Sequence, residues 1–590
     1  MLSAGQCKYA RNIFLKKKWF FSILFLSSIL IFMRLTRADM QTDGAFYSMW
    51  SVGWVDFLYS QKQTTPIQWF GYIPWWGNLS FHAHPPFVFL IQHIFFKIFG
   101  ESVFIARLPF ALAGVGSLIV LYYIVRKLYD EPRALLSMFL LGINTFFTWS
   151  ARITYLEAIE TFFILLSFFI FLRFMEDAKF YFFFGISLGL TILTKYTSFF
   201  IIPVFIVYFF VNKENVESFK DSIKKFILSF LLAFIIFSPV ILYNIMMLME
   251  RGHPDVQFSS VLPMFSEAAK KDWPILFQDK KSPKYLSNFF GFFFGGLKGS
   301  LSPTMFWAIL LSCVWIFIKF LFKKKKNQDP LLIFSLIFLM ILFTLIAPTQ
   351  RYFPIVLPFV VMVLGISICD MYDYFKKNNL RSFIFIFKIF IFCLISYEFI
   401  FNINTNIAKQ ARGKESVAFS SIRLENLGFQ QVEEYLSSFW KNQKTYFRKA
   451  RSSESFQQFA ITNEKIKGNN IFFFQEGLEW YATTWYFLRN HLYHNVQIST
   501  EMNFAQAKIE EKKWFSYLRK SGVQNIFYVT GEDDSVFLDP SKIELEQKRI
   551  SDFLKKEFIA LGRENNNLEI QDIYNDKNKL AFKIYKLYLQ

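Results

Sequence analysis

The feature that most constrains this chain is a series of apolar runs between Phe20 and Phe401, many of them close to twenty residues long. A helix of about 20 apolar residues is long enough to cross the hydrocarbon core of a bilayer. Runs repeated in this way are typical of an α-helical polytopic membrane protein. The composition agrees, since 54% of the 590 residues are hydrophobic.

The charge of the chain follows from its membrane segments. The formal net charge is +20 at pH 7, and many Lys and Arg residues flank the apolar runs. We therefore expect a lipid bilayer and no nucleic acid as a partner. The four cysteines show neither metal-ligand spacing nor a disulfide framework.

Basic residues at the ends of the runs predict an orientation. Lys16 to Lys18 hold the N-terminus in the cytoplasm, and short basic loops then recur on that side, as the positive-inside rule requires. Residues 87–99 are apolar but short, and a span there would turn the basic loop 323–326 outward, so we expect an interfacial helix. This pattern predicts about eleven spans: near 20–33, 108–125 and 134–149, one ending at Arg173, 180–193, one leading to the loop after Val211, 226–247, one ending before Lys323, one leading to Ala347, one ending near Lys376, and 382–401.

The composition changes near residue 404, where charged residues become frequent and apolar runs shrink to strand length. We predict a transmembrane domain over 1–403, with long outer loops at 36–107 and 248–302. Residues 404–590 are predicted to form a soluble extracytoplasmic α/β domain, with strands at 470–475, 524–531 and 580–589 and helices at 432–440 and 504–520.

The polar residues that stand out all fall on the predicted outer side. Each has a structural alternative: Asp43 as a solvated helix cap, Arg152 and Glu157 as an ion pair, and Lys195 and Arg351 as cations reaching for lipid headgroups. A charge at bilayer depth is costly unless it is paired or faces a water-filled cavity. Together, acids and cations beside aromatic segments suit a phosphate-bearing lipid, because cations hold the phosphate and an acid lies near the reacting carbon.

The order of short motifs resembles a known family. It comprises TDGAFY (42–47), HPP (84–86), FGES-IAR-P (99–109), AR-TYLE (151–157), LTKY (193–196), RGHPDVQF (251–258), GGLKGSLSP (295–303) and QRYFPIVLP (350–358). This set resembles the membrane half of GT-C class polyprenyl-phosphate-sugar glycosyltransferases, which include bacterial protein O-mannosyltransferase-like enzymes and lipid A aminoarabinose transferases. The resemblance covers roughly residues 20–370, and the tail resembles no family in the same way.

The resemblance implies a glycosyltransferase (hexosyl- or pentosyltransferase) with a GT-C-like fold. It would move a sugar from a polyprenyl-phosphate donor to an acceptor glycan, lipid or protein on the outer face of a bacterial inner membrane. The resemblance implies two catalytic acids: Asp43 matches the family's acid of the first outer loop, a general base or an acceptor-positioning group, and Glu157 matches its second acid. The chain departs from the pattern at Gly44, where a second acid is usual, and at Glu157, where Asp is common. The residues implied in binding donor phosphate or substrate are His84, Arg152, Lys195, Arg351 and Tyr352.

No cofactor is predicted. A divalent metal is compatible with the chemistry, but no residue pattern indicates one. His82, His84 and His93 share a loop, yet single histidines beside Pro and aromatic residues are more often structural.

Two other classes remain open at this point. A transporter or flippase of lipid-linked sugars would carry ionisable residues deep within its spans and inverted repeats, and neither is clear here. A non-catalytic scaffold whose tail binds cell-wall material is the other.

Overall fold

The computed structural model describes residues 4–53, 84–215, 218–272, 285–322, 329–408, 425–440, 470–494, 496–501, 518–520, 522–537, 545–565 and 567–589. They fall into two compact units. The first lies within Met1–Leu35, Ser80–Ile91 and Arg107–Arg423, and the second within Thr36–Leu79, Gln92–Ala106 and Leu424–Gln590. The aromatic run 68–81, His82 and the basic loop 323–326 are outside the described residues.

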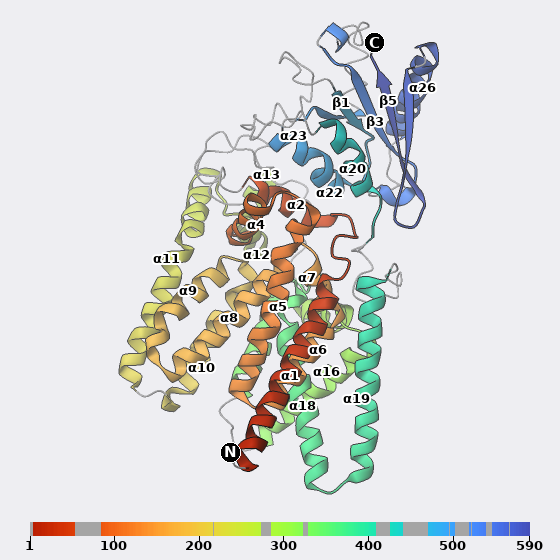
Figure 1. Cartoon of the computed structure of the whole chain (residues 1–590). Helices are drawn as coiled ribbons and strands as arrows, with labels where there is room; N and C mark the ends of the chain where they lie inside the picture. The colour runs from red at the N-terminus through yellow and green to blue at the C-terminus, as the bar shows by residue number, and fades with distance from the viewer. Residues whose placement is uncertain are drawn as a thin grey trace. The chain divides into compact units, whose positions relative to one another are not determined.

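The first unit is helical (Figure 1). Its principal helices, of which α5 begins in the second unit, are α1 (Ala4–Phe32), α5 (Val103–Leu128), α6 (Glu131–Ile143), α7 (Thr145–Arg152), α8 (Glu157–Glu176), α9 (Tyr181–Ile192), α10 (Ile201–Val211), α11 (Phe219–Arg251), α12 (Val256–Val261), α16 (Pro303–Phe322), α17 (Asp329–Ile346), α18 (Leu357–Lys377) and α19 (Arg381–Asn402). Short turns η4 (Tyr196–Phe200) and η8 (Gln350–Ile355) precede α10 and α18.

A helix overlaps each of the predicted spans, so the prediction of a multi-span helical protein is confirmed. Among the described helices, five are long and apolar enough to cross a membrane, or six if a bent pair counts as one span. Several others, including α9, α10, α16 and α17, are shorter apolar helices. The number eleven therefore stays a prediction. The expected helix at Phe87–Phe99 is present as α4, with 13 residues.

The predicted third span is not one straight helix. It is broken at Asn144 into α6 and α7, whose axes differ by 63°. Asn144 begins the second piece, because its side chain accepts a hydrogen bond from the Phe147 N–H at 2.9 Å. Asn is among the favoured helix N-caps, so a polar side chain in the middle of an apolar run ends one helix and starts the next.

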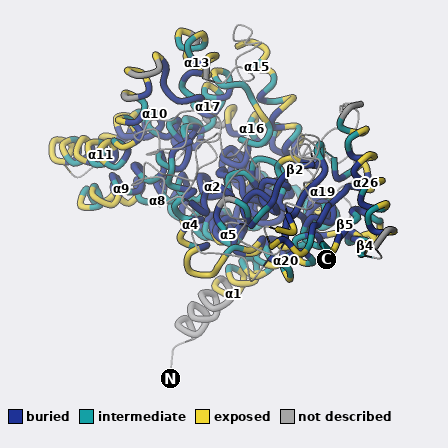
Figure 2. The backbone as a smooth tube through the Cα atoms, turned by 90° about the horizontal axis from the view of Figure 1, so that it is seen from above, coloured by how far each residue is buried: buried dark blue, intermediate teal, exposed yellow. Residues whose placement is uncertain are grey.

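The outer surface of the helical unit is apolar. Helix α11 leaves Ile227, Leu231 and Phe234 more than half exposed, and exposed residues follow it in Figure 2. On a water-soluble protein an apolar surface of this size would be a liability, whereas lipid tails cover it in a bilayer.

The second unit contains a five-stranded mixed sheet of order β2-β1-β3-β5-β4 (Figure 1). Strands β1 (Asn470–Phe474), β2 (Ile498–Thr500) and β3 (Asn525–Gly531) are parallel to one another, and β5 (Leu580–Tyr588) joins β3 and β4 (Leu568–Tyr574) in antiparallel pairs. The three strands and the first helix predicted for this region are confirmed. The second predicted helix, 504–520, lies almost wholly outside the described residues.

Helices cover both faces of this sheet. Leu554 and Phe558 of α26 (Leu545–Asn565) pack against Ile471 and Phe473 in one cluster. On α20 (Phe429–Trp440), the Phe429 ring lies 4.9 Å from the ring of Phe582. All five residues of β1 are buried, as expected for a parallel strand covered on both faces.

Candidate active site

Motifs that are far apart in the sequence meet in the helical unit. The HPP and LTKY motifs join where the Phe87 N–H donates to the Leu193 carbonyl at 3.3 Å. LTKY meets RGHPDVQF through a hydrogen bond from the Tyr196 hydroxyl to Asp255. It meets TYLE through an ion pair of Lys195 with Glu157.

The last two motifs also lie against each other. The Gln350 side chain donates to the Gly299 carbonyl. A Cβ atom at Gly296 would lie 1.9 Å from the Phe353 ring, so this position has room only for glycine. These two contacts place GGLKGSLSP directly against η8, the turn that carries Arg351 and Tyr352.

The ion pair of Glu157 and Lys195 is the centre of this cluster. The Glu157 and Lys195 side chains are only 4% and 6% exposed. Glu157 is the first residue of α8, where the partial positive charge of the helix N-terminus favours a carboxylate. Burial alone would lower the pKa of Lys195, but the neighbouring Glu157, Tyr352 and Glu160 raise it, so the lysine stays charged.

Tyr352 and Arg351 adjoin the pair. The Lys195 ammonium lies 3.9 Å from the centre of the Tyr352 ring, within the range of a cation–π contact. Arg351 donates to the Tyr352 hydroxyl at 3.0 Å, and both residues are half-buried. The structure thus brings four of the predicted residues together.

His84 is a fifth. It is 2% exposed, and burial followed by the charge of Lys195 lowers its pKa well below the ordinary value of 6.5. The imidazole is therefore neutral at pH 7. Toward an anion it would offer a hydrogen bond rather than the full positive charge that the resemblance implies at this motif.

Arg152 makes its described contacts elsewhere. Its guanidinium donates to the carbonyls of Leu30 and Ile31, both at 2.8 Å, and of Arg34 at 3.3 Å. Arg107, the arginine of FGES-IAR-P, donates to the Leu35 carbonyl at 2.7 Å. The last carbonyls of a helix lack partners within it, so Arg152 caps α1, while Arg107 binds the segment that follows the helix. Glu157 pairs with Lys195 rather than with Arg152, and the role of Arg152 toward the donor stays a prediction.

Glu160 is an acid that the sequence reasoning missed. It lies one turn after Glu157 on α8, is 0% exposed, and accepts a hydrogen bond from Thr197 at 2.5 Å. Among the residues that the structure describes, its other oxygen has no hydrogen-bond partner. Its position three residues after Glu157 could have identified it, because residues i and i+3 share a helix face. An acid within an apolar helix is also costly, which indicates a specific role.

Asp255 was noted only as part of a motif. It is 0% exposed and caps α12 by accepting from the N–H groups of Gln257 and Phe258, both at 3.0 Å. Burial raises its pKa to about 6. Its hydrogen bond from Tyr196 ties the segment that follows α11 to the residue next to Lys195.

Asp43 belongs to the other compact unit. It is the second residue of α2 (Thr42–Val52), is half-buried, and lies in the first turn, while Gln41 occupies the N-cap. The distribution of the predicted residues is therefore uneven: five lie in one cluster, Arg152 caps α1, and Asp43 lies on a helix of the second unit.

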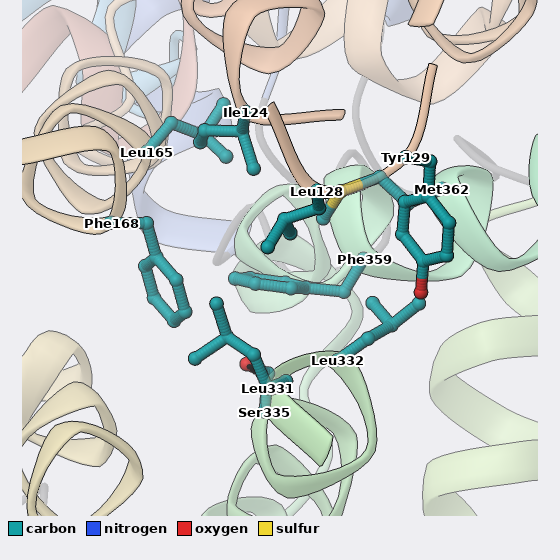
Figure 3. Close-up of a pocket in the computed structure, with 10 residues that line it drawn as sticks. All are labelled: Ile124, Leu128, Tyr129, Leu165, Phe168, Leu331, Leu332, Ser335, Phe359 and Met362. Carbon is teal, nitrogen blue, oxygen red and sulfur yellow. Dashed lines mark hydrogen bonds between the residues drawn. The ribbon is translucent and has the colours of Figure 1, made fainter. Parts of the chain in front are cut away.

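The described parts of the chain offer no metal site, and a small pocket in them is largely apolar. No group of three or more His, Cys, Asp or Glu residues there could hold a metal ion. A small pocket lies between α5, α8, α17 and α18 (Figure 3). Its only polar groups are the Tyr129 and Ser335 hydroxyls among apolar side chains, so it has no acid or cation for catalysis.

Comparison with solved structures finds two kinds of similar protein. An oligosaccharyltransferase from Archaeoglobus fulgidus is 13% identical at a TM-score of 0.49, covering 87% of this chain and 68% of that one. ArnT from Cupriavidus metallidurans, bound to undecaprenyl phosphate, is 12% identical at a TM-score of 0.47, covering 96% and 97%.

Sequence comparison finds relatives in two bacteria. The "Putative mannosyltransferase YkcB" of Bacillus subtilis (strain 168) is 26% identical over 133 residues, 22% of this chain and 18% of the relative. An uncharacterized protein of Aquifex aeolicus (strain VF5) is 31% identical over 129 residues, 21% of this chain and 26% of the relative. The chain thus matches about a fifth to a quarter of the length of these relatives.

One family model matches the membrane part. Residues 83–243 match the family described as dolichyl-phosphate-mannose-protein mannosyltransferase. This segment contains HPP, AR-TYLE and LTKY, the motifs that supply His84, Glu157 and Lys195. Over residues 83–243 the chain is therefore similar to the dolichyl-phosphate-mannose-protein mannosyltransferase family, and the resemblance predicted from its motifs is confirmed there.

Proposed function

We propose that this protein is an integral membrane glycosyltransferase that moves a sugar from a polyprenyl-phosphate donor to an acceptor glycan, lipid or protein. The transfer takes place on the outer face of a bacterial inner membrane. The observation that carries the proposal is the cluster of the buried Glu157–Lys195 pair with Arg351 and Tyr352, within and beside the segment that matches the mannosyltransferase family.

The cluster suits a lipid phosphate in charge and position. Lys195 and Arg351 supply two cations, and the neutral His84 supplies a hydrogen bond next to Lys195. In a site of low polarity each of these interactions is worth more than in water. A phosphate monoanion arriving at Lys195 would share the ammonium with Glu157, because an ammonium carries three N–H donors.

The proposed step is a displacement at the anomeric carbon. An oxygen of the acceptor attacks that carbon, the bond from the carbon to the phosphate oxygen breaks, and the bonding electrons leave with the polyprenyl phosphate. Lys195 and Arg351 stabilise the negative charge that develops on the leaving phosphate. Asp43 accepts the proton from an acceptor hydroxyl, whereas an acceptor that is itself a phosphate would need no base.

Glu157 then has a positioning role. It fixes the Lys195 ammonium at the N-terminus of α8 and keeps it charged. We assign Asp43 as the general base and Glu157 as the acid that orients the phosphate-binding lysine.

The test is transfer from radiolabelled undecaprenyl-phosphate sugars to candidate acceptors by the purified full chain in detergent. With the correct pair of substrates, Asp43→Asn should lower kcat by about a hundredfold to ten-thousandfold, the usual contribution of an acid–base group. Arg351→Ala should raise KM for the donor. Asp534→Asn changes an exposed acid in the same unit as Asp43 and is the matched control.

The same assay separates the rival class. A flippase of lipid-linked sugars would move the donor across proteoliposome membranes without breaking its bond to phosphate. Flipping without transfer would refute the proposal. Normal turnover of a folded Asp43→Asn protein would remove Asp43 from the chemistry or indicate a phosphate acceptor.

A further inference from the structure

Within the second compact unit, the segment that follows α1 is bound to the C-terminal domain through one buried carboxylate. Asp39 is 2% exposed. Its Oδ2 accepts from the N–H groups of Leu427, Gly428 and Phe429 at 2.6, 3.1 and 3.2 Å. Its Oδ1 accepts from the Gln430 N–H at 3.0 Å. Asp39 thus caps α20, a helix almost four hundred residues further along the chain.

The backbone of the same segment is held as well. The Asp39 N–H donates to the Glu425 carbonyl at 3.0 Å. The Tyr486 hydroxyl accepts from the Met40 N–H at 2.9 Å and donates to Asp39 at 3.2 Å. Burial raises the pKa of Asp39, and the N–H groups around it counter that rise. Residues 39 and 40 are therefore hydrogen-bonded to the C-terminal domain through both side-chain and backbone groups. This segment cannot shift independently of α20 without breaking these bonds.

Helix α2, which carries Asp43, begins at the third residue after Asp39 and packs against the same domain. The Phe46 ring lies 5.3 Å from the ring of Trp480, the first residue of α22 (Trp480–Thr483). A Cβ atom at Gly53, which ends α2, would lie 2.8 Å from the Tyr493 ring. The helix is therefore in close contact with the C-terminal domain at Phe46 and at its C-terminal end.

A second connection holds the other end of the outer loop. Glu101, of the FGES motif, accepts from His494 Nε2 at 2.9 Å and lies 3.5 Å from Arg489 Nε. Arg489 is 3% exposed and also pairs with Glu433 of α20 at 2.5 Å. The two flanks of the first outer loop are thus each bound by a charged residue to the C-terminal domain.

Polar side chains of α4 also contact α2. Gln92 donates to the Ser48 hydroxyl at 2.9 Å and to the Ala106 carbonyl at 2.8 Å. His93 Nδ1 lies 2.8 Å from the Ser51 carbonyl. Both side chains are buried.

We infer that the C-terminal α/β domain is a frame for the catalytic loop, and that Asp39 and Glu101 are its positioning residues. They fix α2, and with it Asp43, in the geometry required for turnover. The inference rests on the proposed role of Asp43 and goes beyond it, because it assigns a mechanical task to a domain that composition alone leaves without one.

The experiment compares Asp39→Asn with Asp533→Asn in the full chain. Asp533 is the matched control, since it is 5% exposed in the same domain and caps a different turn through the Ser535 N–H at 2.9 Å. Asp39→Asn replaces two carboxylate oxygens, which accept from four N–H groups, with one amide oxygen and one NH₂ group that cannot accept. We expect faster amide hydrogen exchange across residues 42–52, a kcat at least tenfold lower and an unchanged KM for the donor, because small displacements of a reacting group cost large factors in rate.

Glu101→Gln provides the same test by a milder change, with Glu532→Gln, an acid paired with Lys555 in the same domain, as its control. It keeps the shape of the side chain and should speed exchange over residues 92–106. This variant answers the question if Asp39→Asn does not fold.

The outcomes separate the two proposals. Absence of transfer by the wild type with every donor would refute the proposed function, while the exchange measurements would still test the frame. Exchange in α2 that is the same for Asp39→Asn and Asp533→Asn, with equal kcat, would overturn the inference.

Discussion

At the scale of single residues, Glu157 and Lys195 are two buried charges that neutralise each other in the helical unit. Two side chains at 4% and 6% exposure have lost their water, and each compensates the other. Removing one partner of such a pair is far more harmful than removing both, because a single charge is left without compensation.

We therefore predict that Lys195→Met lowers the free energy of unfolding by about 3–5 kcal/mol. The double variant Lys195→Met/Glu157→Gln should recover most of this loss while remaining inactive. Denaturant unfolding in mixed micelles measures the loss of stability in the single variant and its recovery in the double variant.

Lys225→Met is the control for that comparison, because Lys225 pairs with Asp221 at 2.7 Å on the exposed surface of α11. Exposed pairs add little to stability, so no measurable change is expected. Equal losses in the single and double variants would show that the pair is not the reason for the instability.

At the scale of secondary structure, the break between α6 and α7 is stabilised by a neighbouring helix. A break within an apolar segment frees backbone groups that lipid cannot bind, so other polar groups must take them. Glu398 of α19 accepts from the Thr145 N–H at 2.8 Å and from the Thr145 hydroxyl at 2.9 Å. The Ser302 hydroxyl also donates to it.

We predict that Glu398→Ala destabilises the protein by about 1–3 kcal/mol for each buried donor it leaves unsatisfied. Glu398→Gln should cost less, since an amide oxygen can still accept. Phe392→Ala on the same helix is the control, because Phe392 is 70% exposed. Thermal unfolding in detergent measures the difference, and equal stability of Glu398→Ala and Phe392→Ala would contradict the role of Glu398.

At the scale of the whole molecule, the predicted orientation follows from the basic loops. The second unit combines the C-terminal domain with both flanks of the first outer loop, so its parts must share one side of the membrane. The short loop before α11 belongs on the opposite side if the positive-inside rule holds.

The measurement is thiol labelling of intact cells in a background free of native cysteines. A cysteine at the exposed position 534 should react with a membrane-impermeant reagent, and one at the exposed position 224 should react only after lysis. Reversed labelling would invert the orientation and move the proposed chemistry to the cytoplasmic face.

The sequence by itself determined where many of the helices and three of the five described strands form. Apolar runs became helices at every predicted span, and the strands at 470–475, 524–531 and 580–589 became β1, β3 and β5. These features depend on local periodicity and burial, which neighbouring residues specify. Glu157, Lys195 and Arg351 also stood out, because a charge beside an apolar run is visible without a fold.

The choice of partners was decided only by the tertiary structure. Lys195, not Arg152, pairs with Glu157 across 38 positions of sequence, and Arg152 instead caps α1. Asp39 joins α20 across 391 positions. Several donors and acceptors are compatible with each of these groups, and only the packing of distant segments determines which of them come within hydrogen-bonding distance.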